Sequence, residues 1–298
     1  MNKVILIFVD GLGIGANDPQ NNPCAQEGIR LLSNFKDQPS QAVQSSSGRL
    51  FSVDAILGVD GIPQSATGQA TLLSGINCPE KIGRHLPGFP NEKIRAILKE
   101  HSLLKKLKEN GLKPVFINAF RPLFFKLPMA LKWRLSATTV ATLAADLDFF
   151  QIGDITNRKS LYHEFTNQYL IHKGFHVPRF THDDAADILY NALENNDFIL
   201  YEYFLTDRAG HAQRMDRAHQ EIFQIDCLIN SLLQKINLEK TWLILTSDHG
   251  NIEDLSMKTH TRNPVMTIIW SKNSDLYKIK LNTLTDLKPL FLNLLKTK

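Results

Sequence analysis

Two short motifs in the last third of the sequence each place an aspartate and a histidine directly after a strand-like apolar run. Residues 206–211 (TDRAGH) follow the run 198–205, and residues 246–250 (TSDHG) follow the run 242–245. In open α/β sheets, ligands bind where parallel strands end at their carboxyl termini. The pattern therefore predicts an α/β sheet with polar, ligand-binding side chains gathered along one edge.

Two further residues are expected at the same edge. Asp10 ends the first apolar run, 4–9, and His260 precedes the last one, 265–270. Three aspartates and three histidines form the ligand set of a two-metal site, and here they are Asp10, Asp207, His211, Asp248, His249 and His260. Taken singly, each is explained at least as well by a solvated turn or a surface histidine, and for the pair Asp207 and His211 that plainer explanation is favoured. Their joint occurrence in this order favours the metal site.

The composition argues against several classes of protein. The chain has 298 residues, of which 43% are hydrophobic and 21% charged, and its net charge of +4 is too small to indicate nucleic-acid binding. Its first apolar run is too short for a signal peptide, and no later run reaches the roughly 18 residues of a membrane span. Three widely spaced cysteines, Cys24, Cys78 and Cys227, fit free thiols. We expect a cytoplasmic enzyme with no nucleic-acid or membrane partner.

Strand-like and helical segments alternate along the chain, which is typical of a mainly parallel sheet with helices on both faces. Predicted helices begin near Ser65 and stop at Gly75, span 94–107, open at 183–184, follow the apolar stripe 222–236 and cover 284–295. Residues 114–118 are a further predicted strand. Residues 120–180 have weak periodicity, so we expect a small cap or elaboration on a single domain that spans 1–298.

A nucleophile is the part still missing from the predicted site. Ser65 stands where a loop enters a helix, so it is a good N-cap at a position that favours anions. A serine is a useful nucleophile at neutral pH only when a base or a metal activates it. Thr67 is the runner-up, because its hydroxyl belongs to the same helix start, and a purely structural cap is the plainer alternative.

The joint motif pattern resembles that of the alkaline phosphatase superfamily. Within it, the cofactor-independent phosphoglycerate mutases and the phosphopentomutases look closest, because 207–211 (DRAGH), 248–251 (DHGN) and 260–265 (HTRNPV) match their metal motifs in order and approximate spacing. The resemblance covers about the first 75 and the last 100 residues. It implies an alkaline-phosphatase-like α/β sandwich that binds two divalent metal ions.

The resemblance also implies a role for each matched residue. One metal would be held by Asp207, His211 and His260, and the other by Asp10, Asp248, His249 and the Ser65 oxygen. Ser65 is the nucleophile both in the Ser-x-x-Gly pattern of the mutases and in the register of the related nucleotide pyrophosphatases. A ligand set that mixes carboxylate, imidazole and alkoxide suits Mn²⁺ or Zn²⁺ better than Mg²⁺ or Ca²⁺.

Two departures from the mutase pattern shape the functional hypothesis. Gln69 stands where the mutases have histidine, and the chain lacks room for their large inserted domain. We therefore expect a hydrolase of phosphate mono- or diesters that acts through a phosphoserine intermediate on a small phosphorylated substrate. A phosphomutase and a non-catalytic metal- or phosphate-binding protein are the alternatives. The sequence leaves the oligomeric state open.

Two arginines are candidates for binding the substrate. Arg84 lies in a basic stretch, 79–110, that would form a cationic rim near a phosphoryl site. Arg121 follows the predicted strand 114–118 and could clamp an oxyanion. A solvated helical face is the plainer explanation of the basic stretch.

Overall fold

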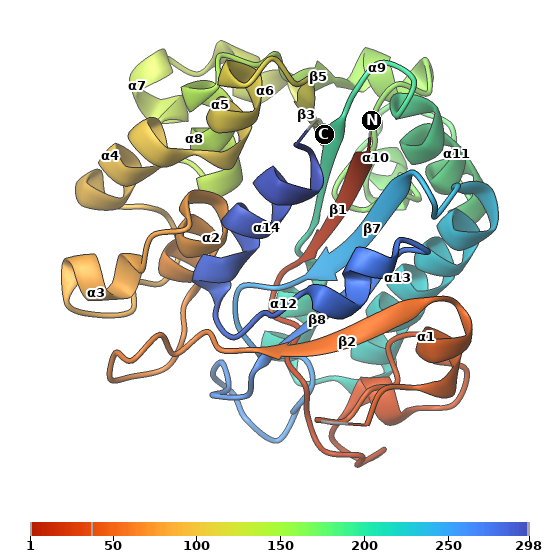
Figure 1. The fold of residues 1–298 in the computed structure, drawn as a ribbon. Coiled ribbons are helices and arrows are strands. Elements are labelled where there is room, and N and C mark those ends of the chain that lie inside the picture. The colour runs from red at the N-terminus through yellow and green to blue at the C-terminus, as the bar shows by residue number, and fades with distance from the viewer. Residues whose placement is uncertain (1, 37, 297–298) are drawn as a thin grey trace.

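A six-stranded sheet forms the centre of the molecule in the computed structural model, which describes residues 2–36 and 38–296 (Figure 1). Its strand order is β2-β8-β7-β1-β6-β3. The strands are β1 (Lys3–Val9), β2 (Gly48–Val53), β3 (Pro114–Phe116), β6 (Phe198–Tyr203), β7 (Thr241–Thr246) and β8 (Val265–Trp270). The neighbours β7, β1, β6 and β3 run parallel, whereas β8 is antiparallel to both β7 and β2. The predicted fold class, a mainly parallel α/β sheet, is confirmed.

The reversed direction of β8 matters for the site. Strands β1, β6 and β7 end at one edge of the sheet, where Val9 is paired with Tyr203 and Phe8 with Thr246. Because β8 runs the other way, its first residue, Val265, lies toward that edge. The segment before β8, which contains His260, is thereby brought to the strand ends that carry the three aspartates.

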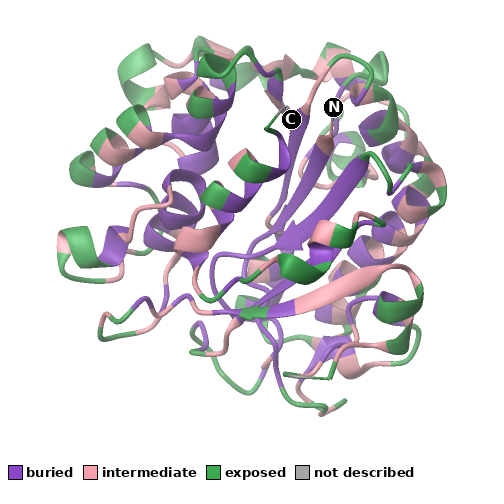
Figure 2. Cartoon of the chain, viewed as in Figure 1, coloured by how far each residue is buried: buried purple, intermediate pink, exposed green. Residues whose placement is uncertain are grey.

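Both faces of the sheet are buried beneath helices. Along β1, side chains 5, 7 and 9 enter one hydrophobic core, and side chains 4, 6 and 8 enter the other. Alternate residues of a strand point to opposite faces, so a continuous apolar run is what a doubly covered strand requires. The buried strands stand out in Figure 2.

The first core lies under α1 (Gln41–Ser45), α11 (His182–Ala192), α12 (Leu205–Ala212) and α13 (Met215–Lys235). The second lies under α2 (Ser65–Ser74), α3 (Cys78–Ile82), α4 (Glu92–His101), α5 (Leu103–Glu109), α8 (Ala137–Ala144) and α14 (Leu287–Leu294). Three short 3-10 helices complete these layers: η1 (Pro23–Ala25), η2 (Ser274–Lys278) and η3 (Leu284–Asp286). Within the described residues, no helix is long and apolar enough to cross a membrane.

The helix expected over 94–107 is instead two helices. Ser102 leaves the helical conformation, with φ −55° and ψ 132°, and its side chain accepts a hydrogen bond from the Lys105 N–H at the start of α5. Its hydroxyl also donates to the carbonyl oxygen of Ala141 in α8, 3.2 Å away. The apolar spacing continues across the break, which explains why periodicity alone predicts one helix.

Residues 120–180 form several short elements that reach both cores. They include part of β4 (Ala119–Phe120), then α6 (Pro122–Lys126), α7 (Met129–Lys132), α8, β5 (Phe150–Gln151), α9 (Ile152–Thr156) and α10 (Gln168–His172). Helix α8 packs against α4 in the second core, while Ile155, Phe165 and Leu170 enter the first. That this range acts as a cap on a single domain stays a prediction.

Candidate active site

Four side-chain atoms converge where β1, β7 and α2 meet. The Nε2 atom of His249 lies 3.0 Å from Ser65 Oγ, 3.3 Å from Asp10 Oδ1 and 3.4 Å from Asp248 Oδ2. Asp10, Asp248 and His249 are all buried. Two carboxylates, an imidazole and a hydroxyl are a donor set that can surround one divalent ion.

A second group forms beside the first, at the end of β6. His211 Nε2 lies 3.5 Å from Asp207 Oδ2, and His260 Nε2 lies 3.4 Å from Asp207 Oδ1 and 3.1 Å from His211 Nε2. Within each group of three, the carboxylate and imidazole ligand atoms all lie within 4.8 Å of one another. The rings of His249 and His260 stack with centroids 3.7 Å apart, so the two groups are neighbours.

Backbone carbonyls orient all three imidazoles in the same way. Nδ1 of His260 faces the carbonyl oxygen of Pro63 at 2.9 Å, that of His211 faces Lys258 at 3.3 Å, and that of His249 faces Gly250 at 3.4 Å. A proton on each Nδ1 leaves Nε2 free to act as a ligand, which is the usual arrangement around metal-binding histidines. The contact from His260 also ties the second group to the loop that leads into Ser65.

The electrostatics of the cluster call for a cation. Burial raises the pKa of Asp10 well above its usual value, and the charges of Asp248, Asp207 and Glu202 raise it further. Asp10 Oδ1 and Asp248 Oδ2 are buried with no hydrogen-bond partner. Unpaired buried carboxylate oxygens are costly, and these two atoms face His249 Nε2. The residues present therefore fit a divalent metal ion.

The pKa of Asp207 is shifted in the opposite direction from that of Asp10. Burial alone would raise its pKa, but a hydrogen bond from His260, the charge of His249 and a hydrogen bond from Asn251 together lower it to about 2. Asn251 Nδ2 donates to Asp207 Oδ1 at 2.6 Å. Asp207 is therefore ionised at neutral pH and ready to act as a ligand.

Ser65 is the first residue of α2 and not its N-cap. The N-cap is Gln64, which makes no capping hydrogen bond with its side chain, so the expected cap role of Ser65 is wrong. The Ser65 hydroxyl points to His249 instead. The runner-up, Thr67, is fully buried; its Oγ1 donates to the Gln64 carbonyl and accepts from the Leu86 N–H. Of the two hydroxyls, only that of Ser65 faces the cluster.

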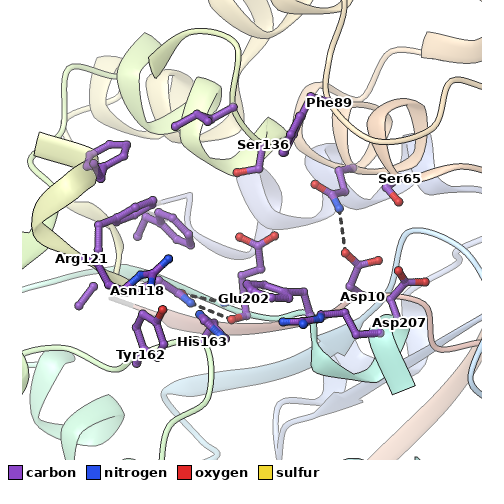
Figure 3. Close-up of a pocket in the computed structure, with 18 of the residues that line it drawn as sticks. Asp10, Ser65, Phe89, Asn118, Arg121, Ser136, Tyr162, His163, Glu202 and Asp207 are labelled. Carbon is purple, nitrogen blue, oxygen red and sulfur yellow. Dashed lines mark hydrogen bonds between the residues drawn. The ribbon is translucent and has the colours of Figure 1, made fainter. Parts of the chain in front are cut away.

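Helix α2 lies very close to the turn that carries Asp248. A Cβ atom on Gly68 would lie 2.5 Å from the Asp248 carbonyl oxygen and 3.0 Å from the Asp248 Cβ. The next residue, Gln69, donates from its Nε2 to Asp10 Oδ2 at 3.2 Å, as the dashed line in Figure 3 marks. Gly68 thus permits the close approach, and Gln69 anchors Asp10.

Sequence reasoning missed Glu253, which holds the loop after β7 together. It is buried and accepts hydrogen bonds from the N–H groups of Gly13 and Asn251 and from the side chains of Thr261 and Asn263. These contacts join the loop after β1, the loop after β7 and the segment before β8. Its only signal in the sequence is a carboxylate five residues after Asp248.

Glu202, inside β6, is a second residue that sequence reasoning missed. It is buried, its carboxylate accepts a hydrogen bond from Thr138 Oγ1 at 2.7 Å, and Asn118 holds its backbone. Burial raises its pKa to about 7, against the opposing effect of the Thr138 hydrogen bond and with a further contribution from Asp248. A lone carboxylate within an otherwise apolar strand was the available signal.

A pocket of about 550 Å³ opens beside the cluster, and Asp10, Ser65 and Asp207 form part of its wall. Figure 3 places these three at one end, Arg121, Asn118, Tyr162 and His163 at the other, and Glu202 between them. Arg121 therefore lines the pocket, as a substrate-binding residue would. Arg84 is exposed and is not among the lining residues.

Comparison with known proteins agrees with this geometry. The family model described as the metalloenzyme superfamily matches residues 137–298, which is more than half of the chain. The chain belongs to this superfamily, and the resemblance to alkaline phosphatases and phosphoglycerate mutases is confirmed at that level. The superfamily comprises metal-dependent phosphoryl-transfer enzymes that act on small phosphorylated substrates, so it implies divalent metal ions.

Among curated relatives, the 2,3-bisphosphoglycerate-independent phosphoglycerate mutase of Metamycoplasma hominis is 34% identical over 128 residues, covering 40% of this chain and 25% of the mutase. The corresponding protein of Methanococcus aeolicus is 30% identical over 90 residues, covering 30% of this chain and 22% of the relative. The match thus spans a quarter or less of each mutase.

Solved structures share the fold over nearly the whole chain. A Pyrococcus horikoshii protein superposes with a TM-score of 0.61 at 15% identity and covers 100% of this chain and 98% of its own. The alkaline phosphatase of the Antarctic bacterium TAB5 gives a TM-score of 0.57 at 16% identity and covers 98% of this chain and 97% of its own. At these identities the likeness shows the fold alone.

Proposed function

We propose that this protein hydrolyses phosphate esters with Ser65 as the nucleophile and two divalent metal ions as cofactors. The observation that carries the proposal is the position of Ser65 Oγ, 3.0 Å from His249 Nε2 and beside the two unpaired carboxylate oxygens of Asp10 and Asp248. A binding protein would have no use for a hydroxyl among these ligands. This argues against the non-catalytic alternative.

The chemistry follows the nucleophilic pattern of phosphoryl transfer. Ser65 gives up its hydroxyl proton to solvent and its Oγ attacks phosphorus, the bond from phosphorus to the ester oxygen breaks, and the departing oxygen takes a proton from solvent. Water then attacks the phosphoserine, which releases inorganic phosphate from a monoester substrate, or a phosphate monoester from a diester substrate, and restores the Ser65 hydroxyl. Ions held by the two groups would favour the Ser65 alkoxide and offset negative charge on the transferred group. Gln69 keeps Asp10 in place throughout.

The ligand assignment supports one ion at Asp10, Asp248, His249 and Ser65 and another at Asp207, His211 and His260. Mixed oxygen and nitrogen ligands favour Mn²⁺ or Zn²⁺ over Mg²⁺ or Ca²⁺. The three cysteines are free thiols, which supports a cytoplasmic location.

Hydrolysis is favoured over isomerisation by the form of the pocket. A mutase has to keep water from its phosphoenzyme while the substrate turns around, which calls for a domain that closes over the site. Here the wall includes the residues Phe89 and Leu123, which are 61% and 67% exposed. An open cleft of this kind admits the water that a hydrolase needs.

Ser65→Ala is the direct test. In protein loaded with Mn²⁺ or Zn²⁺, turnover of 4-nitrophenyl phosphate and bis(4-nitrophenyl) phosphate should fall by about a thousandfold or more, while metal content is unchanged. Wild-type protein quenched during turnover should yield a phosphorylated peptide that contains Ser65. Thr67→Val serves as the control for the second hydroxyl and should keep most of the turnover.

Two outcomes would overturn the proposal. Loss of turnover in Thr67→Val together with normal turnover in Ser65→Ala would move the nucleophile to Thr67. Interconversion of phosphoglycerate or phosphopentose isomers, with no release of phosphate or alcohol from any ester, would establish the mutase instead.

A further inference from the structure

Two guanidinium groups that form no ion pair with any described residue line the pocket, and the charges of both act on Tyr162 and His163, which Figure 3 places at the end away from Ser65. Arg121 directly precedes α6, Arg208 lies in the first turn of α12, and both line the pocket. Among the residues that the structure describes, no carboxylate oxygen lies within the 4.0 Å of an ion pair from either group. Burial raises the pKa of Glu221, and the charge of Arg208 opposes that larger effect. The Glu221 carboxylate accepts its hydrogen bond from the Tyr203 hydroxyl and not from Arg208.

Both positive charges act on the same part of the pocket. His163, which also lines it, has its pKa lowered to about 3 by burial and by the charges of Arg208 and Arg121. Its imidazole is therefore neutral at physiological pH and stacks on Phe204 with ring centroids 4.2 Å apart. Two cations and a neutral ring thus act together on this part of the pocket, and within the part of the chain that the structure describes neither arginine forms an ion pair with a carboxylate.

Apolar side chains make up much of the remaining pocket wall. They come from the loop before α4, from β3 and β4, and from α6 and the segments after it: Phe89, Phe116, Phe120, Leu123, Phe124, Leu127 and Leu135. The rings of Phe120 and Phe124 pack in a tilted arrangement with centroids 4.2 Å apart, and Phe149 packs against both. A pocket of this size and lining is suited to a ligand with an apolar body and a few polar ends.

We propose that the substrates are phosphate esters whose leaving group has an apolar body and ends in a second anionic group, bound by Arg121 and Arg208. This inference rests on the proposed function only in that the scissile phosphate is placed at Ser65. A guanidinium binds a carboxylate or a phosphate through two parallel hydrogen bonds. The buried carboxyl of Glu202, midway along the pocket, disfavours an anion there and so leaves the arginine end as the place for the second charge.

Matched substrates test the inference. Phenyl and biphenyl phosphates would carry at the far end a carboxylate, a phosphonomethyl group or, as the uncharged control, a carbamoyl group. The phenyl and biphenyl substrates differ in length. In at least one of these two series, kcat/KM for an anionic substrate should exceed that for its carbamoyl counterpart by about tenfold or more, which is the effect of one charge-assisted hydrogen bond. Comparison of kcat/KM between the carboxylate and the phosphonomethyl substrates shows whether the second anionic group is a carboxylate or a phosphate.

Variants then locate the preference. Arg121→Gln and Arg208→Gln should each reduce the ratio of kcat/KM between anionic and uncharged substrates several-fold, mainly through KM. Arg179→Gln is the matched control, because Arg179 is exposed and lies outside the pocket wall, and it should leave the ratio unchanged. Equal kcat/KM for anionic and uncharged substrates at both lengths would overturn the inference, as would a preference that both arginine variants retain.

A binding measurement separates this inference from the hydrolase proposal. The uncleavable 4-carboxybenzylphosphonate and 4-carbamoylbenzylphosphonate, with their biphenyl analogues, would be titrated calorimetrically into metal-loaded protein. Tighter binding of a carboxylate compound that is lost in Arg121→Gln or Arg208→Gln supports the subsite even if no ester is turned over. Equal affinity at both lengths overturns the subsite even if esters are hydrolysed.

Discussion

The two ends of the pocket are built in different ways. At the Ser65 end, the chemical groups follow directly from buried strands, and close backbone packing fixes them, as at Gly68. At the Arg121 end, the two guanidinium groups are exposed and form no ion pair within the described residues, Arg121 directly before the short helix α6 and Arg208 in the short helix α12, beside an aromatic wall. The rigid end is suited to chemistry, and the open end is suited to selecting a leaving group.

Of the substitutions considered in this comparison, one at Gly68 should disturb the geometry of the Ser65 end most severely. In Gly68→Ala the new Cβ would meet the Asp248 backbone at 2.5 Å, so α2 and Ser65 would have to move away from His249. A displacement of this kind lowers catalytic rates by about a hundredfold. Steady-state kcat on 4-nitrophenyl phosphate measures the loss.

Gly153→Ala is the control for that substitution. Gly153 lies in α9, and a Cβ added there would have nothing within 4 Å, so kcat should stay at the wild-type value. Equal rates in Gly68→Ala and wild type would show that the close approach of α2 to Asp248 is not needed for catalysis.

Glu202 lies between the two ends, and its raised pKa predicts a smaller effect, which is a loss of stability as the pH rises. Its pKa in the folded protein is raised from 4.5 to about 7, so the folded state binds more protons than the unfolded state between these values. Its contribution to stability is therefore complete below pH 4.5 and is lost as the pH rises through 7. A pKa shift of this size corresponds to a change of about 3 kcal/mol in the free energy of unfolding across this pH range.

Glu202→Gln should remove that pH dependence. The amide oxygen can still accept from Thr138, so metal-free Glu202→Gln should gain stability relative to metal-free wild type at pH 8 and not at pH 4. Urea unfolding at the two pH values gives the comparison. A stability difference between the two proteins that does not change with pH would refute the raised pKa.

The same contrast explains what the sequence could predict. The aspartates and histidines were found because each lies within a short motif next to an apolar run, and β1, β6, β7 and β8 were predicted for the same reason. Strand β2 was missed because it lies at the edge of the sheet and its residues are partly exposed. Its polar Arg49 and Ser52 interrupt the apolar pattern.

Long-range partners account for the rest of what was missed. Glu253 and Glu202 act through contacts with segments far away in the chain, as in the bond from Thr138, 64 residues before Glu202. Arg208 lies inside the motif that identified Asp207 and His211, yet only the fold brings it to the same pocket as Arg121. Local patterns identify groups at strand ends, whereas a pocket made from separate short elements requires the tertiary structure.

Metal content is the most direct test of the two-metal site. Wild-type protein purified without chelator and reconstituted with Mn²⁺ or Zn²⁺ should contain two equivalents by elemental analysis, as the two ligand groups imply. Asp207→Asn and Asp248→Asn should each reduce the metal content to about one equivalent. Asp207 belongs to the set of three ligands and Asp248 to the set of four, so each variant removes a ligand from one ion only. Less than one equivalent in the reconstituted wild type would contradict the account.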